Sequence, residues 1–191
     1  MVRTRRRPIS GVQIILMLLA LMLIVQLINE LTAGSLRVWG IYPRTERGLL
    51  GILIAPFLHG SWWHLFNNML GFSIFSGLCL TRGQRFFSRA SLIILILGGS
   101  LVWAFGRPTN HIGAGGWIFG LWSLSIALAW FERSFVNFCV ALVVIVFYGG
   151  MAMGILPSNP SVSFEGHAFG AFAGVVAAAV LAKPKRKIRR R

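Results

Sequence analysis

Long apolar blocks, separated by short polar segments, dominate the sequence. Because an α-helix rises 1.5 Å per residue, a block of about 20 apolar residues matches the roughly 30 Å hydrocarbon core of a bilayer. Within each block the apolar residues are continuous and do not form a stripe on one helix face. The pattern predicts an all-α, polytopic membrane protein with six transmembrane helices at residues 11–31, 62–80, 86–105, 113–131, 134–156 and 164–182.

One further apolar stretch, residues 49–58, is too short to span and is interrupted by Pro56. It predicts an interfacial or re-entrant segment within the first external loop. The arginine-rich start resembles a signal peptide, but the apolar run after it is too long, so a retained first helix is expected. The expected organisation is a basic N-terminus (1–10), a six-helix membrane domain (11–182) and a basic tail (183–191).

The net charge of +15 is distributed unevenly between the two sides of this topology. The N-terminus, the segment 82–89, Arg133 and the tail together carry fifteen Lys and Arg residues, and the opposite side carries four. The positive-inside rule therefore predicts a multi-pass protein with both termini in the cytoplasm. The basic termini are expected to attract anionic lipids. Nucleic-acid binding is not expected, because no aromatic-interleaved surface or folded motif accompanies the charge.

Three of the predicted spans run inward from the outer side, and each begins with unusual residues. An ionisable group at the bilayer centre costs on the order of 2.5–3.5 kcal/mol, so polar residues within spans usually face the bundle interior and indicate function. The pattern therefore predicts one polar site at similar depth in the outer leaflet. Its members are His64, Asn68, Gly113, Gly115, Gly116, Glu165, Gly166 and His167.

His64 and Asn68 are four residues apart and share one helix face. Both donate hydrogen bonds without bringing permanent charge into a dry site, which suits the stabilisation of a developing oxyanion. The alternative is that they bond each other or a neighbouring backbone and so hold helices together. Taken alone, the pair favours this alternative.

Glycines recur at four-residue spacing in two of the spans. Such rows allow helix backbones to approach closely in lipid, so we expect the two helices to pack together. The rows are Gly116 and Gly120 in one span, and Gly166, Gly170 and Gly174 in the other. This packing would bring residue 115 near His167, within about 2.6–3.2 Å for a serine side chain at that position.

Three segments, in order, resemble the rhomboid intramembrane proteases of bacteria, and the similarity covers nearly the whole chain. The segment GIYPRTERGLLGILIAPFLHGSWWHLFNNML is similar to their first external loop and second helix, with an H-x4-H-x3-N pattern. HIGAGGWIFG is similar to the G-x-S-G-x-x-x-G nucleophile motif, with Gly115 in place of serine. EGHAFGAFAG is similar to the helix 6 motif that carries the dyad histidine, His167.

The resemblance implies a Ser-His dyad endopeptidase of the bacterial inner membrane that cleaves transmembrane protein substrates without a metal or other cofactor. It implies that His167 is the general base. It also implies that His64, Asn68 and the backbone N–H of residue 115 form the oxyanion hole. Phe119 matches the aromatic residue that packs against the histidine, and His59 matches a supporting position. The loop 157–163 matches the family's cap, and the oligomeric state is left open.

Glycine offers no nucleophile, and removing the nucleophile of subtilisin costs about a millionfold in kcat, so the chain is expected to be catalytically inactive. Ser123 and Ser125 lie deeper, and Ser100 and Ser163 match no motif position. Two explanations are open: a deliberate Ser→Gly change in an active protease, or a natural pseudoprotease that binds membrane proteins without cleavage. The retained histidines and Asn68 favour the first explanation.

Two other classes of protein are weaker alternatives. A transporter or channel would place charges through both leaflets or carry paired broken helices, whereas the polar cluster here is confined to the outer half. A zinc protease could use the four histidines at 59, 64, 111 and 167. The chain has no H-E-x-x-H motif, however, and His59 and His64 do not share a helix face.

Overall fold

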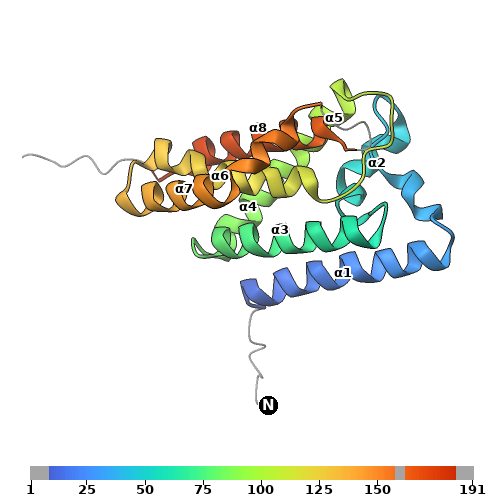
Figure 1. Cartoon of the computed structure of the whole chain (residues 1–191), viewed down its shortest axis with the longest axis horizontal. Coiled ribbons are helices and arrows are strands. Elements are labelled where there is room, and N and C mark those ends of the chain that lie inside the picture. The colour runs from blue at the N-terminus through green and yellow to red at the C-terminus, as the bar shows by residue number, and fades with distance from the viewer. Residues whose placement is uncertain (1–8, 158–161, 184–191) are drawn as a thin grey trace, which may run out of the picture.

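A computed structural model describes residues 9–157 and 162–183, and within them the chain is helical without a β-strand (Figure 1). A single bridge joins Ile41 to His111. The elements are α1 (Gly11–Leu31), η1 (Ser35–Trp39), α2 (Glu46–Ile54), η2 (Ala55–Phe57), α3 (Trp62–Leu80), α4 (Gln84–Ile93), a π-helical turn η3 (Ile94–Gly98), α5 (Gly99–Phe105), α6 (Gly115–Glu132), α7 (Phe135–Tyr148), η4 (Gly149–Ile155) and α8 (Phe164–Leu181).

Serine side chains cap the long helices α3, α7 and α8, as Ser10 does for α1. The hydroxyl of Ser61 accepts from the backbone N–H of His64, that of Ser134 from Asn137, and that of Ser163 from Gly166. Each bond satisfies one of the N–H groups that a helix N-terminus leaves without a partner. The first turns of α3, α7 and α8 are therefore set by local sequence.

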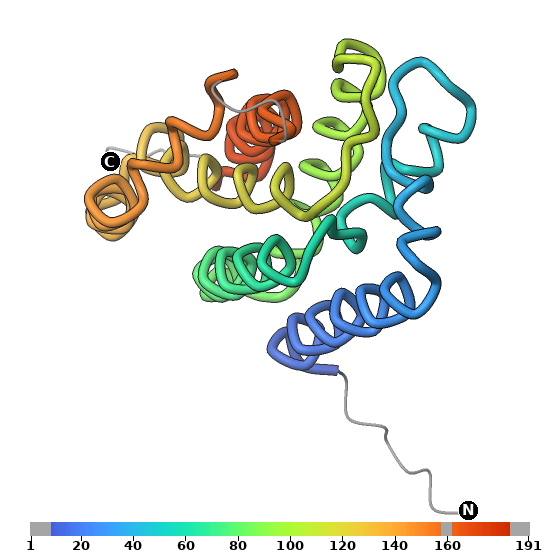
Figure 2. Tube along the Cα trace, turned by 45° about the vertical axis from the view of Figure 1, so that its right-hand side comes forward, coloured from blue at the N-terminus to red at the C-terminus, as the bar shows by residue number. Residues whose placement is uncertain are grey.

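Helix α6 is the centre of the bundle, with α3, α7 and α8 packed around it (Figures 1 and 2). Every residue from Trp117 to Ser125 is buried. In contrast, α1 and α7 expose large apolar side chains along their outer surfaces, which is the arrangement expected of helices that face lipid. The core is thus built on α6 and shielded from lipid by its neighbours.

The contact between α6 and α8 is made by backbone against backbone. A Cβ at Gly170 would overlap the carbonyl oxygen of Gly116, and a Cβ at Gly174 would overlap that of Gly120. A Cβ at Gly116 would in turn lie 2.9 Å from the carbonyl oxygen of Gly166. Only glycine allows this approach, which holds the start of α8 beside the start of α6.

The prediction of an all-helical polytopic bundle is confirmed, while the count of six spans stays a prediction. Four described segments are long and apolar enough to cross a membrane: α1, residues 84–105, residues 135–155 and α8. A fifth is formed if α2–η2 and α3, bent by 77°, make one span. Pro56 lies in η2 at this bend, so the stretch 49–58 is broken where the sequence suggested. The basic termini and most of the expected cap loop lie outside the described residues.

Candidate functional site

A cavity of about 730 Å³ opens at the end of the bundle where α3, α6 and α8 begin. Gly115 and His167, which the sequence placed together, both line it, and so do His64 and Asn68. Residues far apart in the sequence therefore meet in one pocket, because the three helices start at the same end (Figure 1).

The imidazole of His167 is held on two sides. Its Nδ1 lies 2.9 Å from the carbonyl oxygen of Gly154, and the Phe119 ring stacks on it with centroids 4.0 Å apart and planes inclined by 6°. A carbonyl oxygen only accepts, so the neutral ring carries its proton on Nδ1 and leaves Nε2 as a free acceptor. Nε2 faces position 115, where a Cβ would lie only 2.5 Å away.

The ring of His64 has the opposite proton arrangement. Its Nδ1 accepts from the backbone N–H of Gly60 at 3.4 Å, so in the neutral ring Nε2 carries the proton. That N–H faces Gly113, whose Cβ would lie 2.6 Å from Nε2. Gly113 also has a φ of +103°, which favours glycine. Gly113 is thus required both by its backbone and by the close approach of a hydrogen-bond donor.

Asn68 lies one turn beyond His64 on α3, and its side-chain nitrogen donates to the backbone oxygen of His64 at 2.8 Å. This is the local bond that the structural alternative anticipated, and it uses one of the two amide hydrogens. Helix α6 begins at Gly115, so the Gly115 N–H is among the groups left free by the helix. Three donors thus line the pocket beside a free imidazole acceptor.

The pocket contains a free base beside several hydrogen-bond donors, on helices packed through glycine. Comparisons with known proteins agree with this arrangement. A family model described as a Rhomboid domain matches residues 46–184. The chain belongs to the rhomboid family. Uncharacterized protein Mb1372 of Mycobacterium bovis and uncharacterized protein Rv1337 of Mycobacterium tuberculosis are each 39% identical over 198 residues, covering 98% of this chain and 82% of theirs. Uncharacterized protein ML1171 of Mycobacterium leprae is 36% identical over 196 residues, covering 98% and 77%.

The histidine of the rhomboid H-x4-H pattern that lies outside the cavity, His59, is fully buried. Its ring meets that of His64 edge to face with centroids 5.0 Å apart. Neither of its ring nitrogens has a hydrogen-bond partner among the described residues. Burial, with the nearby His64 as a smaller cause, lowers the pKa of His59 from 6.5 to about 4. His59 thus packs against the ring of His64 as a neutral side chain.

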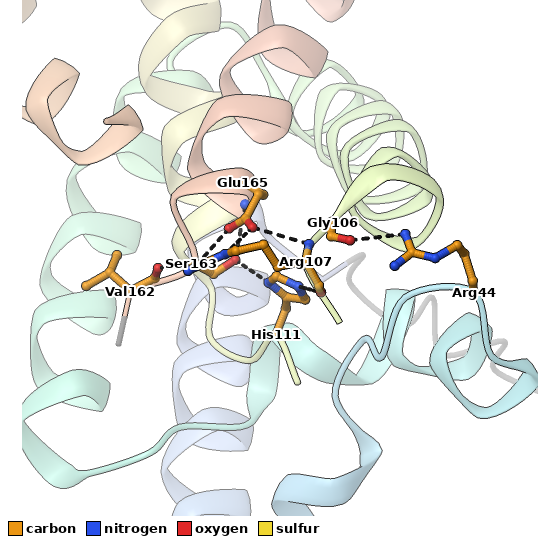
Figure 3. Close-up of polar contacts among 8 residues, drawn as sticks. Arg44, Gly106, Arg107, His111, Val162, Ser163 and Glu165 are labelled. Atoms are coloured by element: carbon orange, nitrogen blue, oxygen red, sulfur yellow. Dashed lines mark hydrogen bonds and ion pairs between the residues drawn. The ribbon is translucent and has the colours of Figure 1, made fainter. Parts of the chain in front are cut away.

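Sequence reasoning missed a second polar cluster on the wall of the same rhomboid pocket. The segment between α5 and α6 is tied there to the start of α8 (Figure 3). Arg107 forms an ion pair with the buried carboxylate of Glu165, and His111 Nδ1 lies 2.6 Å from the hydroxyl of Ser163. The serine ahead of residue 164 was recognisable as a helix cap, but nothing in the sequence pairs it with His111.

The second polar cluster shows which residue Glu165 binds. Both oxygens of Glu165 face Arg107, so the carboxylate serves the loop and not the His167 ring. Within residues 9–157 and 162–183, no three His, Cys, Asp or Glu side chains are grouped so that they could hold a metal ion.

Proposed function

We propose that this rhomboid binds a transmembrane segment of another membrane protein in the pocket, and that the pocket is a Ser-His protease site lacking only its nucleophile. The observation that carries the proposal is the free Nε2 of His167 facing position 115. A serine hydroxyl at 115 would need a base whose Nε2 is unprotonated and accepts no other hydrogen bond, and His167 is held in this tautomer.

With a serine at 115, the chemistry would follow from the groups present. The hydroxyl oxygen would attack the scissile carbonyl while its proton passes to Nε2 of His167, which later donates it to the leaving amine. The negative charge on the carbonyl oxygen would be stabilised by the N–H of residue 115, Nε2–H of His64 and the second amide hydrogen of Asn68. As the sequence stands, the substrate segment is bound and not cleaved.

A second candidate, a natural pseudoprotease, is favoured by the position of the His167 ring. A Cβ at 115 would lie 2.5 Å from Nε2 and 2.8 Å from Cδ2, so the imidazole occupies space that a serine would require. The Phe119 stack and the bond to Gly154 oppose its retreat. In this candidate the pocket is adapted to glycine, and its role is binding alone.

Restoring the nucleophile separates the two candidates. Gly115→Ser protein is reconstituted in liposomes with a transmembrane substrate whose outer end contains helix-destabilising residues, since a helical peptide bond must unwind before attack. Cleavage that disappears in Gly115→Ser/His167→Ala supports the first candidate, a protease site that lacks only its nucleophile. Substrate crosslinking to the pocket without cleavage supports the pseudoprotease. Absence of crosslinking in both proteins contradicts the proposal.

The proposed setting is the cytoplasmic membrane of a bacterium, with both termini inside and the pocket toward the outer side. The distribution of basic residues supports this orientation, and the tail is proposed to lie on anionic lipids. A cytoplasm-dependent reporter fused after Arg191 is expected to be active. If a periplasm-dependent reporter at the same point were active instead, the C-terminus would lie outside and the proposed orientation would be wrong.

A further inference from the structure

Ser163 and His111 are paired in the manner of a nucleophile and its base (Figure 3). The distance from Ser163 Oγ to His111 Nδ1 is 2.6 Å. The other ring nitrogen, Nε2, lies 3.1 Å from the carbonyl oxygen of Arg107. Since that oxygen only accepts, the neutral ring carries its proton on Nε2, and Nδ1 accepts the hydrogen of the serine hydroxyl. A serine, a base and a carbonyl group that orients the base are thus linked by hydrogen bonds.

Both members are held in place by their backbones. His111 exchanges two backbone hydrogen bonds of 2.9 Å with Ile41, and its side chain is buried. Ser163 caps α8, and its oxygen accepts from the Gly166 N–H at 3.1 Å. That N–H lies at the positive end of the helix dipole, so it stabilises negative charge that develops on the hydroxyl oxygen. Burial lowers the pKa of His111, which keeps the ring neutral and able to accept a proton.

The pair is also within reach of a ligand. Ser163 is half-buried, and both Ser163 and His111 line the 730 Å³ cavity. The carboxylate nearest to them, Glu165, is neutralised by Arg107. A capping role explains the bond from Gly166. The capping hydroxyls of Ser61 and Ser134 accept similar backbone bonds, but among the described residues neither is hydrogen-bonded to a histidine ring. The bond to His111 is the additional feature.

From this geometry we infer that Ser163 and His111 form a second, independent nucleophile–base pair that accepts acyl groups from carboxylic esters. The Ser163 oxygen attacks the ester carbonyl, and the proton passes to Nδ1 of His111. The C–O bond to the alcohol breaks, and the alcohol leaves with that proton. Water then attacks the acyl carbon as His111 takes one of its protons. The bond between the Ser163 oxygen and the acyl carbon breaks, and His111 returns the proton to that oxygen as the acid leaves. Amide bonds are not expected to react, because an amine is a poorer leaving group than an alcohol.

A fluorophosphonate probe tests the inference in the full-length protein in detergent micelles. The Ser163 oxygen would form a bond to phosphorus as fluoride leaves, and peptide mass spectrometry would locate the adduct. We expect labelling at Ser163 and hydrolysis of a p-nitrophenyl ester. Both should fall about 100-fold in His111→Gln, in line with the loss of a general base. Ser163→Ala should lose both.

Matched variants distinguish loss of the nucleophile from loss of folding. Ser163→Asp retains a capping oxygen but removes the nucleophile, and Ser134→Ala removes a capping serine that no histidine accompanies. The first should be unlabelled although folded, and the second should be labelled at Ser163 at the original rate. An unmodified Ser163 in folded protein, or equal labelling rates with and without His111, would overturn the inference. Substrate crosslinking, measured on the same samples, reports separately on the proposed transmembrane binding.

Discussion

His167 and His111 line one pocket, and each is held by a backbone carbonyl, but through opposite ring nitrogens, so their free nitrogens face different surroundings. Each neutral ring donates one N–H to a backbone carbonyl, that of Gly154 for His167 and that of Arg107 for His111. The remaining nitrogen of His167 faces a glycine, whereas that of His111 faces a hydroxyl. An oriented base therefore does not require a nucleophile beside it: the pocket contains one such base that faces a glycine and one that faces a serine.

The largest expected effect comes from removing each imidazole in turn in Gly115→Ser protein. His167→Ala should reduce transmembrane cleavage by about 1,000-fold or more, because the base is lost. His111→Gln should change it less than about tenfold, since that ring serves another serine. Rates are measured by gel analysis of substrate in liposomes. Equal losses in both variants would mean that the two histidines act as one unit.

His59 sharpens the comparison as an imidazole with no partner on either nitrogen among the described residues. It stays neutral in the folded protein down to pH about 4, whereas the unfolded chain takes up the proton near 6.5. Between these values the unfolded state binds more protons, so stability falls as the pH falls. The loss is on the order of 3 kcal/mol, or roughly 100-fold in the unfolding equilibrium.

Thermal unfolding in micelles at pH 7.5 and 4.5 measures this loss. The loss of stability between the two pH values should be smaller in His59→Gln. Part of the loss should remain in this variant, because burial also lowers the pKa of His111. An unchanged difference in His59→Gln would show that His59 is not the group responsible.

A smaller effect is expected from disturbing only the support of His167. A Cβ at Gly154 would lie 2.8 Å from Phe119 Cζ and 3.3 Å from His167 Nδ1. Gly154→Ala in Gly115→Ser protein should therefore lower cleavage about tenfold, equivalent to roughly 1.4 kcal/mol, and leave Ser163 labelling unchanged. Gly149→Ala is the matched control, since the nearest atom to its Cβ would be 4.0 Å away.

The smallest effect concerns the support of His111. Arg107 donates to Glu165 and to the carbonyl oxygen of Val162, which holds the loop against the start of α8. Arg107→Gln should slow fluorophosphonate labelling of Ser163 by about threefold, a change of less than 1 kcal/mol. The exposed Arg47→Gln should not alter it. A rate for Arg107→Gln equal to that of Arg47→Gln would show that the ion pair does not position the pair.

The sequence was sufficient for the helices and for the meeting of Gly115 with His167, because apolar block length and glycine spacing are local signals. It was insufficient for Arg107–Glu165 and Ser163–His111. Those contacts join segments more than 50 residues apart, and their residue types are equally common in loops and caps. The proton positions on His64 and His167 also depend on the carbonyl or N–H that each ring meets, which no pattern along the chain specifies.

The burial of α6 has a consequence for how the protein is made. This helix, which carries Gly115 at its start, is not among the segments apolar enough to qualify as a span by themselves. Its partner α8 is synthesised later, so α6 leaves the ribosome before the surface that covers it exists. The wall of the pocket that α8 contributes, including His167, is therefore added last, after the helices that carry His64 and Gly115 have been made.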